Sequence, residues 1–511
     1  MIMQKQSDGS YEQIGFIKSK AGESIDKIVD ANGDVYFTQG FTREVGGIPP
    51  LTLPNAISKP LVDYSIYGNS IQDGTPSPEN PVEVQSVGDR TDNLFNENDV
   101  TYGYWITDTG SISSLVASVG YDRKISVIAG KAICARAYGE KPFNIAIGYY
   151  DADNAFILRV NSMTGSIVSA PPANAAYGVV YIASGNISST NPITPEKLAS
   201  YKIVLSYGES TEYEPYGYRI PVVVRSKNLF DKNDATVLGY INSSGNVQSG
   251  GSGWYTTQNF IKCSGIISLH AENGLGNGAY IACYNSAKVL IGTVRQSNNN
   301  SASVTVQLVS GTKYIKTCCR DNNLDNYQLE FGDTATEYET YHEPVTTNIY
   351  LDEPLRKIGD YYDAIDFNSQ TVIRNIKKIA FDGSEQWIKN QYYSGDYYLN
   401  YRNFAKENST LICSHVPYTP FTALTIGHCT IGKYLNIWIL DKTSTLADWE
   451  KYLNQQYNAG TPITVHVVMV SPTIESITLP QLPTFSGTTI VSTGTEVEPS
   501  DMEIAYKGTK P

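Results

Sequence analysis

Short segments of β-branched and aromatic residues, separated by polar turns, run through most of the chain. Residues 202–205, 220–224, 302–308 and 502–506 are of this kind, and in several of them apolar and polar positions alternate with a period of two. Clusters of Asn, Asp and Gly between the segments are typical of turns. The pattern predicts an all-β protein built of antiparallel β-sandwiches.

One segment departs from this pattern. From Thr445 to about Tyr457 apolar residues recur every three or four positions, Thr445 can cap the amino end, and Gly460 follows the carboxyl end. These signals predict one clear helix. A shorter helical turn is expected near Pro195, because proline suits the first turn of a helix.

A long segment of the chain is present twice. Residues 93–96 (Asn-Leu-Phe-Asn) open a segment that closes at residues 211–216 (Thr-Glu-Tyr-Glu-Pro-Tyr), and residues 228–231 (Asn-Leu-Phe-Asp) open another that closes at residues 336–341 (Thr-Glu-Tyr-Glu-Thr-Tyr). Each copy has the length of an independent domain, not of a solenoid repeat. Because copying a surface multiplies contacts, the duplication favours a binding or spacing role over catalysis.

These signals divide the chain into five regions. Residues 1–50 form an N-terminal anchoring region too small for a core of its own. Residues 51–90 are a proline-rich connector, expected to be extended and stiff. The two copies are β-sandwich modules over residues 91–225 and 226–345. Residues 346–511 form a β-rich C-terminal domain that carries the predicted helix.

Composition narrows the classes of partner. The chain has 511 residues, a formal net charge of -13 and no cluster of Lys and Arg, so we expect neither nucleic acid nor an anionic membrane as a partner. It has no apolar stretch of about eighteen residues, and residues 1–6 do not resemble the start of a signal peptide. We expect no membrane span and no export on a signal of its own.

The seven cysteines show no C-x-x-C spacing and stand mostly in apolar surroundings. We interpret them as reduced core thiols, which fits assembly in a reducing cytoplasm, and assign no function to the adjacent Cys318 and Cys319. No cofactor or metal site is predicted. Residues 151–154 (Asp-Ala-Asp-Asn) are most simply a hairpin turn, although a structural Ca²⁺ there remains an open alternative.

No catalytic motif stands out. The sequence has no G-x-S-x-G, P-loop or H-E-x-x-H pattern, and residues 413–415 (Cys-Ser-His) and 428–429 (His-Cys) are interpreted as strand packing. We therefore predict that the protein is not an enzyme. A glycosidase would need two carboxylates at a separation that sequence spacing cannot give. The candidates for such a pair are Asp151, Asp153, Asp321, Asp325, Asp360, Asp363 and Asp366.

Tyrosine is the better functional signal. It occurs 38 times against 14 Phe, and its ring offers a flat apolar face and a hydroxyl to a sugar. The candidate residues for sugar stacking are Trp254 and Tyr255, which follow the glycine-rich residues 249–253, together with Tyr149 and Tyr150. Packing within half-buried strands is the alternative role for each of them.

Residues 64–89 (Tyr-Ser-Ile-Tyr-Gly-Asn-Ser-Ile-Gln-Asp-Gly-Thr-Pro-Ser-Pro-Glu-Asn-Pro-Val-Glu-Val-Gln-Ser-Val-Gly-Asp) resemble a connector in tail-associated structural proteins of phages that infect Gram-positive bacteria. In such proteins an Asn-Leu-Phe opening and a Thr-x-Tyr-Glu-Pro-Tyr close border a jelly roll similar to carbohydrate-binding modules. Residues 355–360 (Leu-Arg-Lys-Ile-Gly-Asp) and 381–387 (Phe-Asp-Gly-Ser-Glu-Gln-Trp) resemble parts of their end domain. The resemblance covers about residues 51–511.

The resemblance implies a structural virion protein of a phage tail, in a fibre or the baseplate, assembled in the host cytoplasm. Its implied partners are other tail or baseplate proteins, further copies of itself in a homotrimer, and the host surface polysaccharide used as receptor for attachment. One departure is Thr340, where the first copy has Pro215. A purely architectural spacer without a ligand is the alternative, and a glycan depolymerase is a further one.

Overall fold

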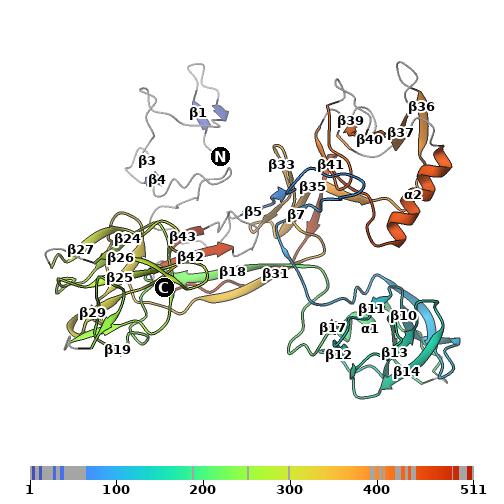
Figure 1. The fold of residues 1–511 in the computed structure, drawn as a ribbon, viewed down its shortest axis with the longest axis horizontal. Helices are drawn as coiled ribbons and strands as arrows, with labels where there is room; N and C mark the ends of the chain where they lie inside the picture. The colour runs from blue at the N-terminus through green and yellow to red at the C-terminus, as the bar shows by residue number, and fades with distance from the viewer. Residues whose placement is uncertain are drawn as a thin grey trace.

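Antiparallel strands make up most of the molecule, which is known here from a computed structural model (Figure 1). The structure describes residues 3–5, 11–13, 27–29, 35–38, 65–186, 189–249, 253–296, 300–391, 397–401, 405–406, 409–420, 427–431, 435–438, 445–485, 487–493 and 503–508. Within these residues two α-helices accompany the strands. The predicted all-β fold class is confirmed.

The N-terminal region contributes two short hairpins to the described residues. β1 (Met3–Lys5) pairs with β2 (Tyr11–Gln13), and β3 (Lys27–Val29) pairs with β4 (Val35–Thr38). The rest of the predicted anchoring region lies outside the described residues.

The first copy, module 1, is a sandwich of two sheets. The larger sheet has the order β14-β13-β16-β10-β9, with β11 paired to β16, and the smaller has the order β15-β12-β17. Its elements are β9 (Val100–Ile106), β10 (Ile112–Tyr121), β11 (Ile125–Ser126), β12 (Ile133–Ala137), β13 (Asn144–Tyr150), β14 (Phe156–Ser162), β15 (Ser166–Ser169), β16 (Tyr177–Ala183), α1 (Pro195–Ser200) and β17 (Ile203–Tyr207). Between the sheets lies a core that includes Ile145, Ile147 and Leu205. Thr194 caps α1, and Pro195 begins it, as predicted.

The second copy, module 2, repeats this plan with shorter strands. The sheet β27-β24-β30 corresponds to β15-β12-β17, and β23-β28-β25-β26 with β19-β22-β29 corresponds to the larger sheet. Its elements are β19 (Val237–Leu238), β20 (Tyr240–Ile241), β21 (Val247–Gln248), β22 (Trp254–Thr256), β23 (Ile261–Lys262), β24 (Ile266–His270), β25 (Tyr280–Tyr284), β26 (Leu290–Arg295), β27 (Ser303–Gln307), β28 (Tyr314–Lys316), β29 (Cys318–Arg320), η1 (Asp321–Asn323) and β30 (Gln328–Phe331). The sequence repeat is therefore a repeat of topology.

A central sandwich joins the two modules. One sheet contains β18, which leaves module 1, and β31, which leaves module 2, paired antiparallel and extended by β8, β42 and β43. The other has the order β38-β41-β35-β34-β5, and Ile220, Ile349 and Ile365 pack between them. These strands are β5 (Ser65–Tyr67), β8 (Asp89–Arg90), β18 (Tyr218–Ser226), β31 (Val345–Leu351), β34 (Ala364–Asp366), β35 (Thr371–Ala380), β38 (Leu411–Cys413), β41 (Thr464–Ser476), β42 (Gly487–Thr493) and β43 (Glu503–Gly508).

The structure of residues 65–90 differs from the extended, stiff connector that the sequence predicted. β5 pairs with β34, and β6 (Ser70–Ile71) pairs with β7 (Gln85–Ser86). The Gln72 side chain donates to the carbonyl oxygens of Val82 (2.9 Å) and Cys413 (2.8 Å), so it links the proline-rich segment to β38. Residues 65–90 are thus built into the central sandwich, while residues 51–64 lie outside the described part of the chain.

The C-terminal region adds a sheet and the predicted helix. The sheet has the order β36-β37-β40-β39, and a hairpin of β32 and β33 lies before it in the chain. Its elements are β32 (Lys357–Ile358), β33 (Tyr361–Tyr362), β36 (Ile388–Gln391), β37 (Tyr397–Tyr401), β39 (Cys429–Ile431), β40 (Leu435–Trp438) and α2 (Leu446–Asn458). Thr445 and Asp448 form a capping box at the start of α2, and Trp449 and Leu453 are buried in the adjoining core.

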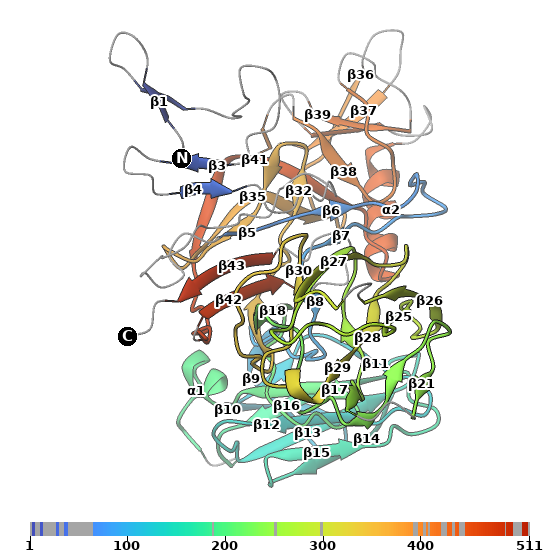
Figure 2. The same ribbon diagram turned by 90° about the vertical axis from the view of Figure 1, so that its left-hand side faces the viewer.

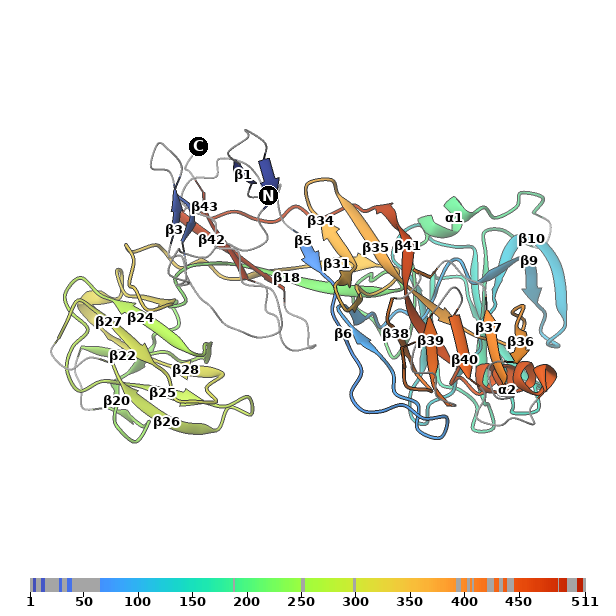
Figure 3. The ribbon, with the colours of Figure 1, turned by 90° about the horizontal axis from the view of Figure 1, so that it is seen from above.

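The modules are displayed at separate positions around the central strands. Seen from above, module 2 lies at one end of the long axis, and module 1 and the C-terminal region share the other (Figure 3). Figure 2 shows the C-terminal sheet and α2 above the central strands β42 and β43, with module 1 below them. Each module therefore keeps surface of its own away from the central sandwich.

Candidate functional site

The Asn-Leu-Phe motif at the start of each copy holds the two ends of its module together. In module 1 the buried Asn93 amide donates to the carbonyl oxygens of Ile203 and Glu214, both at 2.9 Å, and accepts the backbone N–H groups of Phe95 and Leu205, also at 2.9 Å. One side chain thus joins the first residues, the last strand and the closing motif. This set of contacts is the asparagine latch of module 1.

Module 2 has the same latch. The Asn228 amide donates to the carbonyl oxygens of Tyr327 (3.2 Å) and Glu339 (3.1 Å) and accepts the N–H groups of Phe230 (3.0 Å) and Leu329 (3.1 Å). The Asn-Leu-Phe and Thr-x-Tyr-Glu borders therefore have a structural role, because a buried polar group must be paired.

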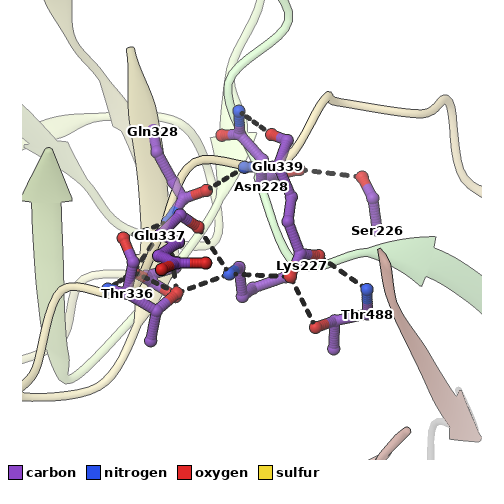
Figure 4. Close-up of polar contacts among 9 residues, drawn as sticks. Ser226, Lys227, Asn228, Gln328, Thr336, Glu337, Glu339 and Thr488 are labelled. Carbon is purple, nitrogen blue, oxygen red and sulfur yellow. Dashed lines mark hydrogen bonds and ion pairs between the residues drawn. The ribbon is translucent and has the colours of Figure 1, made fainter. Parts of the chain in front are cut away.

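The closing glutamate of module 2 also ties the module to the central sandwich (Figure 4). The Glu339 carboxylate contacts the Lys227 ammonium at 3.0 Å and accepts the Thr488 N–H at 2.6 Å and the Thr488 hydroxyl at 3.0 Å. Burial alone would raise the pKa of Glu339, but the Thr488 N–H and the charge of Lys227 hold it below its ordinary value. Because Thr488 belongs to β42, these contacts fix module 2 on the central sheet.

In module 1 the corresponding Glu214 binds β18, the strand that leaves the module, and the residue before the latch asparagine. Its carboxylate contacts Arg219 at 2.9 Å and accepts the Asp92 N–H at 3.2 Å. Both partners lie in the segments that enter and leave module 1. The two copies therefore share the latch but differ in what the closing glutamate holds.

A hairpin covers the outer face of the larger sheet in both modules. In module 1 the linked ends of β9 and β10 bring Ile106 so close to Gly148 that a Cβ there would lie 2.4 Å from the Ile106 Cδ1 atom. In module 2 the β20–β21 hairpin places Ile241 against Ala282. Hence the better candidate for a ligand site is the end of the larger sheet where β13 ends and β16 begins in module 1, and where β25 ends and β28 begins in module 2.

At that end module 1 presents two tyrosines. Tyr150 and Tyr177 are register partners on β13 and β16, and their half-buried rings stack at 5.1 Å between centroids. The Lys124 ammonium lies 4.3 Å from the Tyr177 centroid and donates to the Asn154 Oδ1 at 2.6 Å. The Tyr177 hydroxyl donates to the same oxygen at 3.0 Å. We call these four residues the tyrosine end of module 1.

Module 2 has an equivalent tyrosine end. Tyr284 and Tyr314 are register partners on β25 and β28, at the positions of Tyr150 and Tyr177. The Phe260 ring meets Tyr284 edge-on at 4.8 Å, and the Lys288 ammonium lies 5.5 Å from the Tyr314 centroid. Lys316 lies 4.8 Å from the Phe260 centroid. These five residues form the tyrosine end of module 2.

The turn that follows β13 or β25 positions one side of each tyrosine end. In module 1 Asp151 caps it by accepting the Ala155 N–H at 2.8 Å, and in module 2 Asn285 accepts the Val289 N–H at 3.0 Å. A residue with positive φ stands in each turn, Asn154 at 64° and Lys288 at 59°. Aromatic faces beside amine and amide donors are suited to stacking on a sugar ring and bonding its oxygens.

Three of the four residues predicted to stack on sugars need correction. Tyr149 is 0% exposed and lies in the core of module 1, which removes it from the candidate binding residues. Trp254 and Tyr255 do not form one platform, because neighbouring side chains of a strand face opposite ways. Trp254 packs on the outer face beneath Arg320, whose Cζ lies 5.3 Å from the ring centroid, and Tyr255 packs on the core of module 2.

Of the predicted residues, Tyr150 alone lies in a tyrosine end. Sequence reasoning missed the other eight residues of the two tyrosine ends, among them Tyr177, Tyr284 and Tyr314 and the lysines Lys124 and Lys288. Aligning the two copies strand by strand would have found the tyrosines, since the pairs are register partners in both. The lysines occupy different positions in the two copies, so no single sequence position marks them.

The cysteines and the Cys-Ser-His segment at residues 413–415 are buried and take part in packing and in hydrogen bonds between strands. All seven cysteines are buried free thiols. The buried Ser414 hydroxyl lies 2.8 Å from the His415 Nδ1 and accepts the Thr464 N–H at 2.9 Å, which joins β38 to β41. These contacts agree with the strand-packing interpretation of residues 413–415.

The most buried of the candidate aspartates stabilises an irregularity in the sheet. The register of β35 shifts between Arg374 and Ile376, and the Asp363 carboxylate accepts the N–H groups of Asn375 (2.8 Å) and Ile376 (3.0 Å) that this bulge leaves. Burial raises the pKa of Asp363, while its backbone donors and the charge of Arg374 oppose that rise. Asp363 is therefore accounted for by the fold.

Across the part of the chain that the structure describes, no group of three or more His, Cys, Asp or Glu side chains is arranged to hold a metal ion. No helix among the same residues is long and apolar enough to cross a membrane. Comparison with family models, curated proteins and solved structures gave no match to this chain.

Proposed function

We propose that this chain is a structural virion protein of a phage tail, in a fibre or the baseplate, whose two modules attach to surface polysaccharide of a Gram-positive host. The resemblance of residues 64–89 and of the module borders to such proteins supports the tail assignment. Other tail proteins and further copies of the chain, as a homotrimer, would be its partners. The modules would act as non-enzymatic carbohydrate-binding domains, of jelly-roll type.

The observation that carries the binding role is the repeated tyrosine end. Both copies keep register-paired tyrosines at the open end of the larger sheet, with a lysine over the second ring. The lysine comes from position 124 in one copy and from position 288 in the other. Both copies thus place a lysine over the second tyrosine ring, although from different positions of the chain. This supports a role in function, because packing of the rings alone does not need a lysine charge.

The connection between the two modules suits weak binding sites that act together. The chain leaves module 1 through β18 and module 2 through β31, and these two strands pair directly with each other. Two sites held on one chain, and more in an oligomer, raise the apparent affinity by effective concentration without new contacts. Attachment to a repetitive polysaccharide needs this kind of multivalency.

The test uses the full-length protein, labelled with a fluorophore, and purified Gram-positive cell walls with and without their wall polysaccharide. We expect saturable binding that is lost on stripping and that falls by at least about tenfold in Y150A/Y284A. Tyr102 and Tyr104 are exposed on module 1 at 40% and 48%, so Y102A/Y104A is the matched control and should bind normally.

Absence of binding by the folded protein on every wall tested would contradict the proposal and favour the architectural spacer. Release of reducing sugar from the wall polysaccharide would favour a depolymerase instead. Equal losses in the two double variants would show that the tyrosine ends are not the binding surface.

A further inference from the structure

The two tyrosine ends share a scaffold but carry opposite charge. In module 2 the lysines at this end are four: Lys262 is the register partner of Tyr314, Lys313 donates its N–H to the Tyr284 carbonyl, and Lys288 and Lys316 lie over aromatic rings. Lys262, Lys288 and Lys313 are exposed, and Lys316 is half-buried. The formal charge of the whole protein is -13, so this group of cations stands out.

The equivalent positions of module 1 can be assigned from hydrogen bonds and register. Ser126 pairs with Tyr177 as Lys262 pairs with Tyr314, and the Ala176 N–H donates to the Tyr150 carbonyl at 2.8 Å, as the Lys313 N–H does to Tyr284. Val179 and Lys316 each lie two residues beyond the second tyrosine, and Asn154 and Lys288 share the positive-φ position of the turn. Four neutral positions of module 1 are thus lysines in module 2.

The carboxylates change in the opposite sense. Asp122, Asp151 and Asp153 lie at the end of module 1, and their counterparts in module 2 are Gln258, Asn285 and Ala287. Two of these neutral residues keep the structural contact of the aspartate that they replace. Thr101 donates to the Asp122 carboxylate at 2.6 Å and Thr236 to the Gln258 amide oxygen at 3.0 Å. Asn285 caps its turn as Asp151 does.

The fold therefore does not require this charge difference. Module 1 has Lys124 and Arg123 against the three aspartates, and Arg123 is already paired with Asp99, whereas module 2 has four lysines and none of those aspartates. Asp234, the carboxylate that approaches this end of module 2, accepts the N–H of Asn259 and its side-chain amide at 2.6 Å. The Asp234 carboxylate is therefore already paired with Asn259.

We infer that the tyrosine end of module 2 binds a negatively charged saccharide, one whose sugar ring carries or neighbours a phosphate or carboxylate, while that of module 1 does not. The inference rests on the proposed function. Tyr284, Tyr314 and Phe260 offer aromatic faces to the sugar, and the lysine ammonium groups supply charge-assisted hydrogen bonds to the anion. A longer polyanion such as nucleic acid is disfavoured, because the rest of the protein is acidic.

The experiment titrates the full-length protein with two probes, a poly(glycerol phosphate) oligomer carrying hexose substituents and dextran, a neutral polysaccharide. We expect tighter binding of the phosphate polymer, weakening as salt rises. K288A/K316A should lose at least about tenfold of that affinity and K288R/K316R should keep most of it. K141A, at an exposed lysine of module 1 outside both tyrosine ends, should keep all of it.

Three outcomes would overturn the inference: equal affinity for both probes, unchanged binding in K288A/K316A, or tighter binding of a single-stranded oligonucleotide. Binding of both probes that Y150A/Y284A abolishes and K288A/K316A leaves intact would refute the charge inference while the proposed function stands. No binding of either probe, with no binding to cell walls, would refute both.

Discussion

Module 1 and module 2 show which parts of a duplicated domain the fold holds constant and which it leaves free. The asparagine latch, the strand order of the two facing sheets and the paired tyrosines are the same in both. The partners of the closing glutamate and the charges around the tyrosines differ. Buried hydrogen bonds tolerate little change, whereas charges at an exposed end can be altered without disturbing the core.

The largest effect is expected from breaking a latch. Asn93→Ala or Asn228→Ala removes four hydrogen bonds and leaves buried N–H and carbonyl groups unpaired, so we expect a loss of about 3 kcal/mol in local stability. Hydrogen exchange measured by mass spectrometry on the full-length protein should show faster exchange in the altered module alone. Exchange that accelerates equally in both modules would contradict two separate latches.

Next in size is the tie between module 2 and the central sheet. Glu339→Gln leaves Lys227 without its carboxylate in a largely buried site, and we expect a loss of about 2 kcal/mol in the docking of module 2. Glu214→Gln is the matched variant in module 1, where Arg219 is more exposed, and should cost less. Faster exchange at β42 in E339Q but not in E214Q would support the difference, and identical profiles would count against it.

Acid should loosen the same tie. Glu339 has its pKa lowered in the folded protein, so its contribution to stability is fully present above its ordinary pKa and is lost as the pH falls through the lower folded value. We expect exchange at β42 to rise at about pH 4 and below in the wild type. In E339Q this pH dependence should be reduced, and an unchanged profile would assign it to other groups.

The smallest effect on stability is expected from exchanging charges between the tyrosine ends. Replacing Asp151, Asp153 and Asn154 by their module 2 counterparts (D151N/D153A/N154K) changes two exposed turn residues and the half-buried Asp151, whose turn contact Asn285 keeps in module 2. The melting temperature should therefore shift by only a few degrees. The exchange should give module 1 measurable affinity for the phosphate polymer when module 2 carries K288A/K316A. A variant that melts normally and gains no affinity would show that the turn charges do not select the ligand.

The sequence was sufficient for the fold class, the duplication and both helices, because strand alternation and helix caps are local signals. It did not give the role of residues 65–90, whose pairing with β34 and with Cys413 joins parts of the chain far apart in sequence. The candidate site was only partly predictable for a related reason. Adjacent tyrosines such as Tyr149 and Tyr150 look alike in sequence, yet Tyr149 is buried in the core, whereas Tyr150 lies half-buried on the opposite face of the sheet and stacks on Tyr177.

The most direct test of the account is hydrogen exchange of the full-length protein with and without solubilised wall polysaccharide of a Gram-positive bacterium. We expect protection of the segments that build the two tyrosine ends, which are residues 120–127, 150–156 and 174–180 in module 1 and residues 258–264, 284–290 and 312–317 in module 2. Protection confined to other surfaces, or none at saturating polysaccharide, would contradict the claim that the tyrosine ends bind glycan.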